Sequence, residues 1–156
     1  MTTGVGTAVI SGGHALFATG GGSTISGTGL TIGVSGNFSS PVSVEAGGSV
    51  SFSGSTLSSN ATMAADTDPA AGARATSGGS LSLNDVTITM AGQRGTGVFV
   101  SDAGSVATLV DTDISTGILS TRANGLHLLA GASASVTRGT IDSKGPNAVL
   151  ADTAHR

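Results

Sequence analysis

The chain has 156 residues, of which 26 are glycine, 10% are charged and 3% are aromatic; its net charge is −3, and it has no cysteine. The low charge excludes a highly charged disordered chain, and the six scattered basic residues form no patch for nucleic acid. Without cysteine, disulfides and thiolate metal sites are excluded as well.

The beginning of the chain does not resemble a signal peptide, because it lacks a basic segment followed by a long apolar run. No apolar run approaches the roughly 18 residues of a membrane-spanning helix. If the native protein is secreted, we expect the targeting segment to be missing from this sequence.

One phrase recurs along the chain. It consists of a pair of alternating apolar residues, a corner of Gly with Ser or Ala, a second alternating pair, a polar step, and a final Ile or Leu. The copies, in chain order, are 14–32, 41–57, 72–88, 97–114, 125–141 and an unfinished 147–156. The first copy is weak, and the unfinished one suggests a truncated coil. An insertion at 58–74 contains Pro69 and predicts a protruding loop.

The copy at 72–88 shows what each phrase builds. Strands place alternate residues on opposite faces, so we expect one apolar and one polar face. The apolar set is Leu81, Leu83, Val86 and Ile88, and the polar set is Ser80, Ser82, Thr87 and Thr89. A corner is expected at Gly78-Gly79, and a bend at Asn84-Asp85, where the alternation shifts phase.

The repeat predicts a parallel β-helix. The closing apolar residues are Ile32, Leu57, Ile88, Ile114 and Ile141, at spacings of 25, 31, 26 and 27 residues. Backbone groups in such short strands must pair with the coils above and below. We therefore predict an all-β, right-handed β-solenoid of five to six coils over 1–156, with Ile88, Ile114 and Ile141 in an internal ladder. Frequent Gly disfavours helices, and a β-sandwich needs no repeated corner phrase.

The phrases GTGVFVSDAGSVATLVDTDIST and NGLHLLAGASASVTRGTI resemble the passenger domains of bacterial autotransporters, in particular the pertactin-like group. The shared pattern is Gly-Φ-x-Φ, a small-residue corner and a closing x-Ile, as in Gly97 to Ile114 and Gly125 to Ile141. The resemblance covers about residues 41–150. It implies export through a Gram-negative outer membrane, surface display or release, and a role in adhesion, self-association or as a rigid stalk.

The same resemblance sets the expected partners. These are a host-cell surface protein or glycan, and other copies of the chain that meet through open coil ends. Contact with a membrane is expected only through a translocator that this chain does not contain. The resemblance brings no catalytic residue, no cofactor and no metal, and we expect no enzyme activity.

Asp85, Asp111 and Asp113 are the first candidate surface residues, since they are predicted to lie outward on neighbouring coils. They could form a Ca²⁺ site or a carboxylate pair for glycoside cleavage, but we interpret them as solvated acids beside strands. Arg138 is expected near the aligned position of Asp85. His127 is expected at the surface, facing outward between inward Leu126 and Leu128.

Two alternatives remain open. One is a polysaccharide-binding or polysaccharide-cleaving β-helix, as in phage tailspikes or lyases, although Trp and Tyr for sugar stacking are absent from the sequence. The other is a purely structural solenoid. Two Thr-x-Thr phrases suggest an ice-binding array, but we expect none because these phrases do not repeat on every coil.

Overall fold

The structure, a computed structural model, describes residues 2–3, 7–11, 13–37, 39–61, 70–117 and 123–153. In this part of the chain every regular element is a β-strand, and the paired strands are parallel. A search of the same residues for a helix long and apolar enough to cross a membrane finds none.

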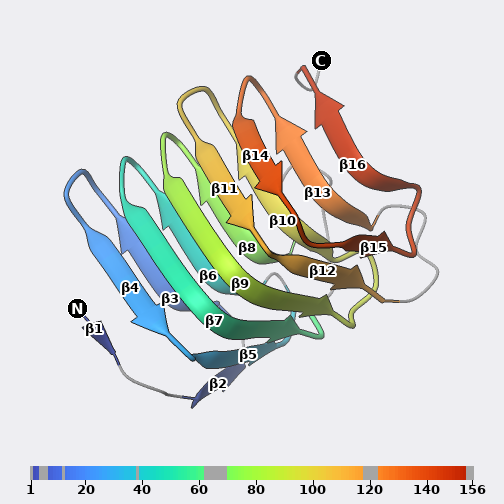
Figure 1. The fold of residues 1–156 in the computed structure, drawn as a ribbon, viewed down its shortest axis with the longest axis horizontal. Helices are drawn as coiled ribbons and strands as arrows, with labels where there is room; N and C mark the ends of the chain where they lie inside the picture. Colours follow the sequence, from blue (N-terminus) through green and yellow to red (C-terminus); the bar gives the residue numbers. More distant parts are fainter. Residues whose placement is uncertain are drawn as a thin grey trace.

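The strands form two sheets (Figure 1). The six-stranded sheet contains β3 (His14–Thr19), β6 (Ser40–Glu45), β8 (Ala71–Thr76), β10 (Thr96–Ser101), β13 (Asn124–Leu129) and β16 (Asn147–Asp152). The ten-stranded sheet bends into two halves, which we call upstream and downstream because the chain passes through them in that order in each turn. Its upstream half contains β1 (Thr2–Thr3), β4 (Thr24–Thr28), β11 (Val106–Val110) and β14 (Ser133–Thr137). Its downstream half contains β2 (Thr7–Ser11), β5 (Thr31–Ser35), β12 (Asp113–Thr116) and β15 (Ile141–Ser143). The long strands β7 (Ser49–Ser59) and β9 (Ser80–Met90) run through both halves.

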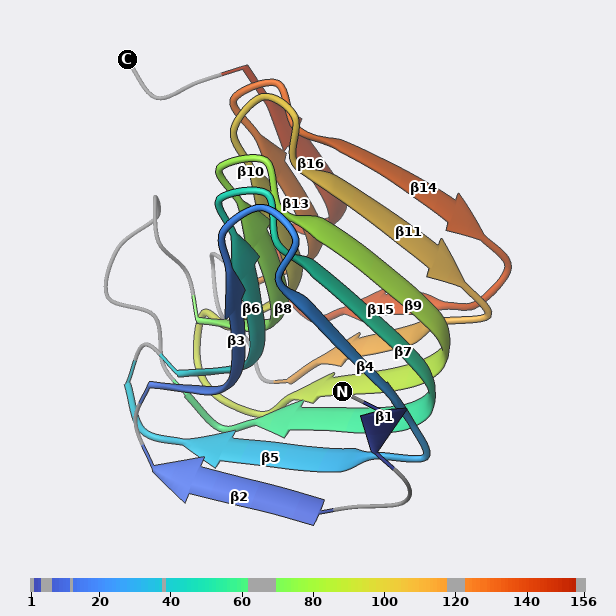
Figure 2. The ribbon, with the colours of Figure 1, turned by 90° about the vertical axis from the view of Figure 1, so that its left-hand side faces the viewer.

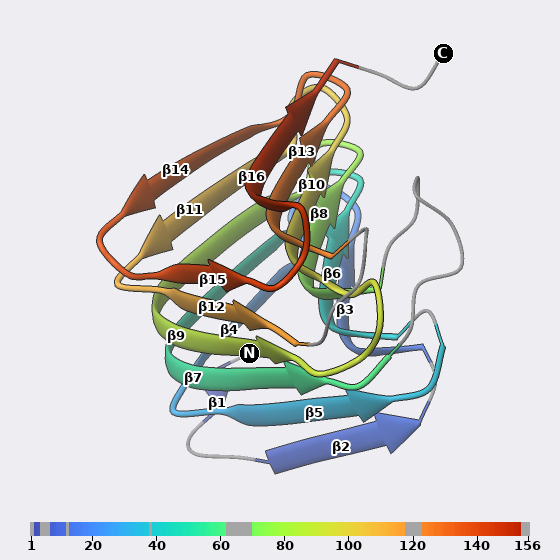
Figure 3. The ribbon, with the colours of Figure 1, turned by 90° about the vertical axis from the view of Figure 1, so that its right-hand side faces the viewer.

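The chain winds through these sheets as a β-solenoid of about five turns, which confirms the predicted fold class. Viewed from the end where the chain starts, each turn climbs the six-stranded sheet, descends the upstream half and returns along the downstream half (Figure 2). This path is clockwise as the chain recedes, and it is anticlockwise from the opposite end (Figure 3). The solenoid is therefore right-handed, as predicted.

The predicted internal ladder is confirmed by the register of the downstream half. Successive strands align the closing apolar residues in one column: Ile32, Leu57, Ile88, Ile114 and Ile141. The alternation in β9 is confirmed as well, because its apolar set is buried and its polar set is exposed. The core is thus a thin stack of aliphatic layers between the two sheets.

In the copies at 72–88, 97–114 and 125–141, the glycine that opens the phrase packs on the isoleucine that closes the same turn. A Cβ on Gly72, Gly97 or Gly125 would overlap a side-chain methyl of Ile88, Ile114 or Ile141, respectively. It would also lie 2.5–2.8 Å from a carbonyl oxygen of the next coil. Glycine at one end of the phrase and isoleucine at the other therefore fill one volume across the interior.

The corners use left-handed backbone. At the predicted corner, Ser77 and Gly78 have φ of 51° and 81°, and the Gly79 N–H donates to the Thr76 carbonyl at 2.9 Å. This is the geometry of a type I′ turn. At the predicted bend, Asp85 has φ of 54°, which Asp tolerates better than most residues. The bend at Asp85 is confirmed, and the corner lies one residue earlier than the predicted Gly78-Gly79.

The predicted insertion at 58–74 is shorter than expected at both ends. β7 extends to Ser59 and β8 begins at Ala71, so the ends of the interval belong to the sheets. Residues 62–69, within the predicted loop, lie outside the described residues.

Candidate functional site

The outward face of the upstream half presents three parallel columns of small uncharged side chains. The register of β4, β7, β9, β11 and β14 aligns Thr24, Ser49, Ser80, Val106 and Ser133; then Ser26, Ser51, Ser82, Thr108 and Ser135; then Thr28, Ser53, Asn84, Val110 and Thr137. All are exposed except Ser49, Ser53 and Val110, which are half-buried. We call this surface the hydroxyl face.

The hydroxyl face combines regularity with an absence of charge. Neighbouring strands in a sheet lie about 4.8 Å apart, so its hydroxyls repeat at that interval along the solenoid. Lys, Arg, Glu and Asp are common at the solvent-exposed positions of proteins, and none of these fifteen aligned positions carries one. Such a face offers many neutral donors and acceptors to one partner at once.

The charged residues predicted as candidates gather at the bend between the two halves. The strand register places Gly54, Asp85, Asp111 and Arg138 opposite one another on successive coils. Each of these four residues has positive φ, between 48° and 59°. The bend thus forms a column of left-handed residues at one border of the hydroxyl face, and the expected alignment of Arg138 with Asp85 is confirmed.

Arg138 binds Asp111 of the preceding coil in a bidentate ion pair. The Arg138 Nε and Nη2 atoms donate to the two carboxylate oxygens at 2.6 and 2.7 Å. The hydrogen bonds from Arg138 lower the pKa of Asp111 below its usual value, and those to Asp111 raise the pKa of Arg138. Both side chains remain exposed to solvent, so the pair joins two coils at the surface and contributes little to stability.

Asp113 also binds the next coil. Its Oδ1 accepts hydrogen bonds from the Thr140 N–H at 2.9 Å and from the Thr140 hydroxyl at 2.7 Å. Asp85 is exposed at the same bend. Among the described residues, no three His, Asp or Glu side chains lie close enough together to hold a metal ion. Asp111 and Asp113 therefore connect coils in this structure, a role that the interpretation as solvated acids did not include.

The prediction that His127 lies at the surface is wrong. His127 does face away from the interior, but only 8% of it is accessible. It is the strand partner of Phe99, and the two rings pack edge to face with their centroids 5.3 Å apart. The Arg74 guanidinium lies 6.0 Å from the centre of the Phe99 ring. Alternation predicts the side of the sheet on which a side chain lies, but it does not predict that bulky neighbours bury His127 on the outer side.

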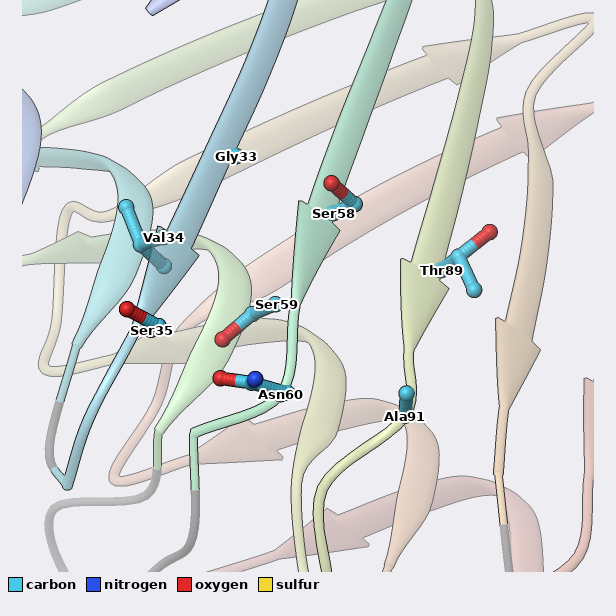
Figure 4. Close-up of a pocket in the computed structure, with 8 residues that line it drawn as sticks. All are labelled: Gly33, Val34, Ser35, Ser58, Ser59, Asn60, Thr89 and Ala91. Carbon is cyan, nitrogen blue, oxygen red and sulfur yellow. The ribbon is translucent and has the colours of Figure 1, made fainter. Parts of the chain in front are cut away.

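A groove that the sequence did not predict lies on the downstream half, where β5, β7 and β9 end (Figure 4). It has a volume of about 360 Å³ and is lined by Gly33, Val34, Ser35, Ser58, Ser59, Asn60, Thr89 and Ala91. Its hollow depends on Gly33, which pairs with Ser58, which in turn pairs with Thr89. The signal in the sequence is a glycine at a position where the next three coils carry the hydroxyl residues Ser58, Thr89 and Ser115.

The candidate residues therefore fall into three places. Asp85, Asp111, Asp113 and Arg138 lie at or beside one bend, His127 lies on the other sheet, and the groove lies at the strand ends of the downstream half. Comparison of the chain with models of protein families, with curated proteins and with solved structures found no match.

Proposed function

We propose that the chain is the passenger β-solenoid of a bacterial autotransporter, and that it acts outside the cell as a rigid, non-enzymatic adhesive module. The proposal places it at the surface of a Gram-negative bacterium or in the surrounding medium. The partner is a host-cell surface protein or glycan, or a second copy of the chain. A rigid stalk without a ligand is the simplest alternative within the same class.

The hydroxyl face carries this proposal. It extends over five aligned strands without a charged residue, and its side chains are too short to lose much conformational entropy on binding. Single hydroxyl contacts are weak, but a rigid array presents them together, so their contributions combine. The coil architecture and the Gly-Φ-x-Φ phrases support the resemblance to passenger domains.

A cell-binding experiment with matched variants tests the proposal. The purified chain would be labelled and titrated onto host cells, with Ser82→Lys/Thr108→Lys as the face variant and Asp85→Ala/Asp111→Ala as the bend variant. Circular dichroism would first establish that each variant is folded. We expect saturable binding by the native chain and at least a tenfold loss in the face variant, because two buried, unpaired charges would oppose contact.

Each other outcome has a defined meaning. Loss in the bend variant alone would move the adhesive site to the acidic bend. Concentration-dependent association of the chain, abolished in the face variant, would make a second copy the partner. Absence of both cell binding and association by the folded chain would overturn the adhesive proposal and favour the stalk.

A further inference from the structure

The groove at the ends of β5, β7 and β9 has the size of a small-ligand site. Its volume of about 360 Å³ falls within the range of roughly 300–1,000 Å³ that ligand pockets occupy. It crosses three neighbouring strands, so it runs along the solenoid axis. The end of β7 is tied to that of β5, because the Asn60 N–H donates to the Val34 carbonyl at 3.4 Å.

The polar groups that point into the groove come from the end of β7. Figure 4 shows the Ser58 side chain pointing toward Gly33, and Ser59 and Asn60 pointing toward the end of β5. No hydrogen bond within the described part of the chain engages the side chains of Ser58 or Asn60. These groups supply hydroxyl and carboxamide donors and acceptors for a ligand.

Ser59 adds a buried hydroxyl to the lining. Only 4% of Ser59 is accessible, and its Oγ accepts the Ala61 N–H at 3.0 Å. Among the described residues this hydroxyl donates no hydrogen bond, so its proton is available to an acceptor in the groove. A buried donor held in place by a backbone amide favours a ligand that brings oxygen atoms.

The chemistry of the lining selects a neutral ligand. None of the eight described residues that line the groove is charged, so neither phosphate nor a carboxylate would find a cation, and a metal ion would find no carboxylate. Val34 and Ala91 supply small apolar surface between the polar groups. A pyranose ring has this same mixture of neutral hydroxyls and short C–H faces.

We propose that this groove is a binding subsite for a neutral glycan, one or two sugar rings long. The inference rests on the proposed adhesive function and names the class of ligand that one part of the molecule recognises. The site binds without cleaving, since no carboxylate among the described residues lines it. Without an aromatic platform, we expect a dissociation constant on the order of 1 mM.

An NMR titration tests the subsite directly. Amide spectra of the full chain would be recorded with lactose, maltose and cellobiose, and with glucuronic acid as a charged comparator. Gly33→Leu fills the groove, and Gly33 lacks the positive φ that would oppose a side chain. Ser58→Ala/Asn60→Ala removes polar groups instead. Ser82→Leu, on the hydroxyl face outside the groove, is the matched control.

We expect at least one neutral disaccharide to shift the amides of 33–35, 58–60 and 89–91. The affinity should fall at least tenfold in Gly33→Leu and in Ser58→Ala/Asn60→Ala, and stay unchanged in Ser82→Leu. Shifts confined to other residues, a response to glucuronic acid alone, or no shift at roughly 20 mM sugar, twentyfold above a millimolar constant, would overturn the subsite.

The subsite and the adhesive function can fail separately. If no sugar shifts the amide signals of the groove residues while the Ser82→Lys/Thr108→Lys variant still loses cell binding, the adhesive function is supported and the subsite is wrong. If a sugar shifts the amide signals of the groove residues while the folded chain neither binds cells nor associates with itself, the subsite is supported and the adhesive function is wrong.

Discussion

The middle coils and the last coil contain equivalent residues in very different surroundings. Leu109 in β11 is fully buried, whereas its strand partner Val136 in β14 is 45% exposed. Leu126 in β13 is 2% exposed, whereas its partner Val149 in β16 is 53% exposed. Both members of each pair belong to the same inward column. Burial in this fold is therefore supplied by the coils on either side, and the local sequence only makes a residue suitable for it.

This difference has an energetic consequence. An inward residue of a middle coil loses contacts on both sides when it is truncated, and its neighbours cannot move without breaking further hydrogen bonds. The last coil can yield, because one edge of β14, β15 and β16 is unpaired in the described chain. Equivalent substitutions should therefore cost more free energy of unfolding in the middle than at the end.

The largest expected effect is at the glycines that pack on the isoleucine ladder. Gly97→Val should reduce the free energy of unfolding by about 3 kcal/mol or more, because its Cβ would overlap Ile114 and approach the Gly125 carbonyl oxygen at 2.5 Å. Gly125→Val meets equivalent atoms, but Ile141 and β16 can move aside. Urea denaturation would measure both, with Ala103→Val at an exposed corner as the control. Equal losses of stability at Gly97 and Gly125 would show that the last coil is packed as tightly as the middle coils.

The ladder itself provides a pair with identical chemistry. Ile114→Ala should cost about 2–5 kcal/mol, as for other fully buried residues, and Ile141→Ala less than half as much. Ile114 is buried between two coils, while Ile141, among the described residues, has a coil on one side only. The same denaturation measurement compares them. A larger loss at Ile141 would show that the last coil is better packed than its exposure indicates.

The smallest effect on stability is expected at the protein surface, in the ion pair between Asp111 and Arg138. Arg138→Gln should raise the pKa of Asp111 toward its usual 3.8, because it removes the hydrogen bonds that lower it. Since the folded-state pKa is depressed, the pair stabilises the fold above pH 3.8 and this contribution is lost as the pH falls through the folded-state pKa. Carboxyl NMR titration of both proteins measures the shift. An unchanged Asp111 pKa would mean that the pair does not form in solution.

The interior could be predicted from the sequence, because each interior feature follows from a repeated residue type. The column of Ile32, Leu57, Ile88, Ile114 and Ile141 was found by spacing alone, and the register confirms every step. The bend at Asp85 was found because the alternation shifts phase there. The packing role of the opening glycine could not be predicted, because Gly97 contacts Ile114 across the interior and the spacing of residues does not reveal such a contact.

The outer surface of the solenoid was harder to predict, because the burial of its side chains and its hollows depend on residues of neighbouring coils. His127 was assigned to the correct side of its sheet, but its burial depends on Phe99 one coil earlier. The groove exists because Gly33 aligns with Ser58 and Thr89. This alignment follows from that of Ile32, Leu57 and Ile88, but spacing alone does not show that the side chains around Gly33 leave a hollow.

Native-state hydrogen exchange, resolved by residue, tests the stacked-coil structure most directly. The account predicts the strongest protection in β9 and β11, whose amides bond within stacked coils, and a decline through β14 and β15 toward β16. In β9 and β11, which have a partner strand on each side, inward and outward residues should be protected alike, because successive amides bond to opposite neighbours. Protection that alternates along β9 or β11, or is as strong in β16 as in β9, would contradict a solenoid in which each coil is stabilised by its neighbours.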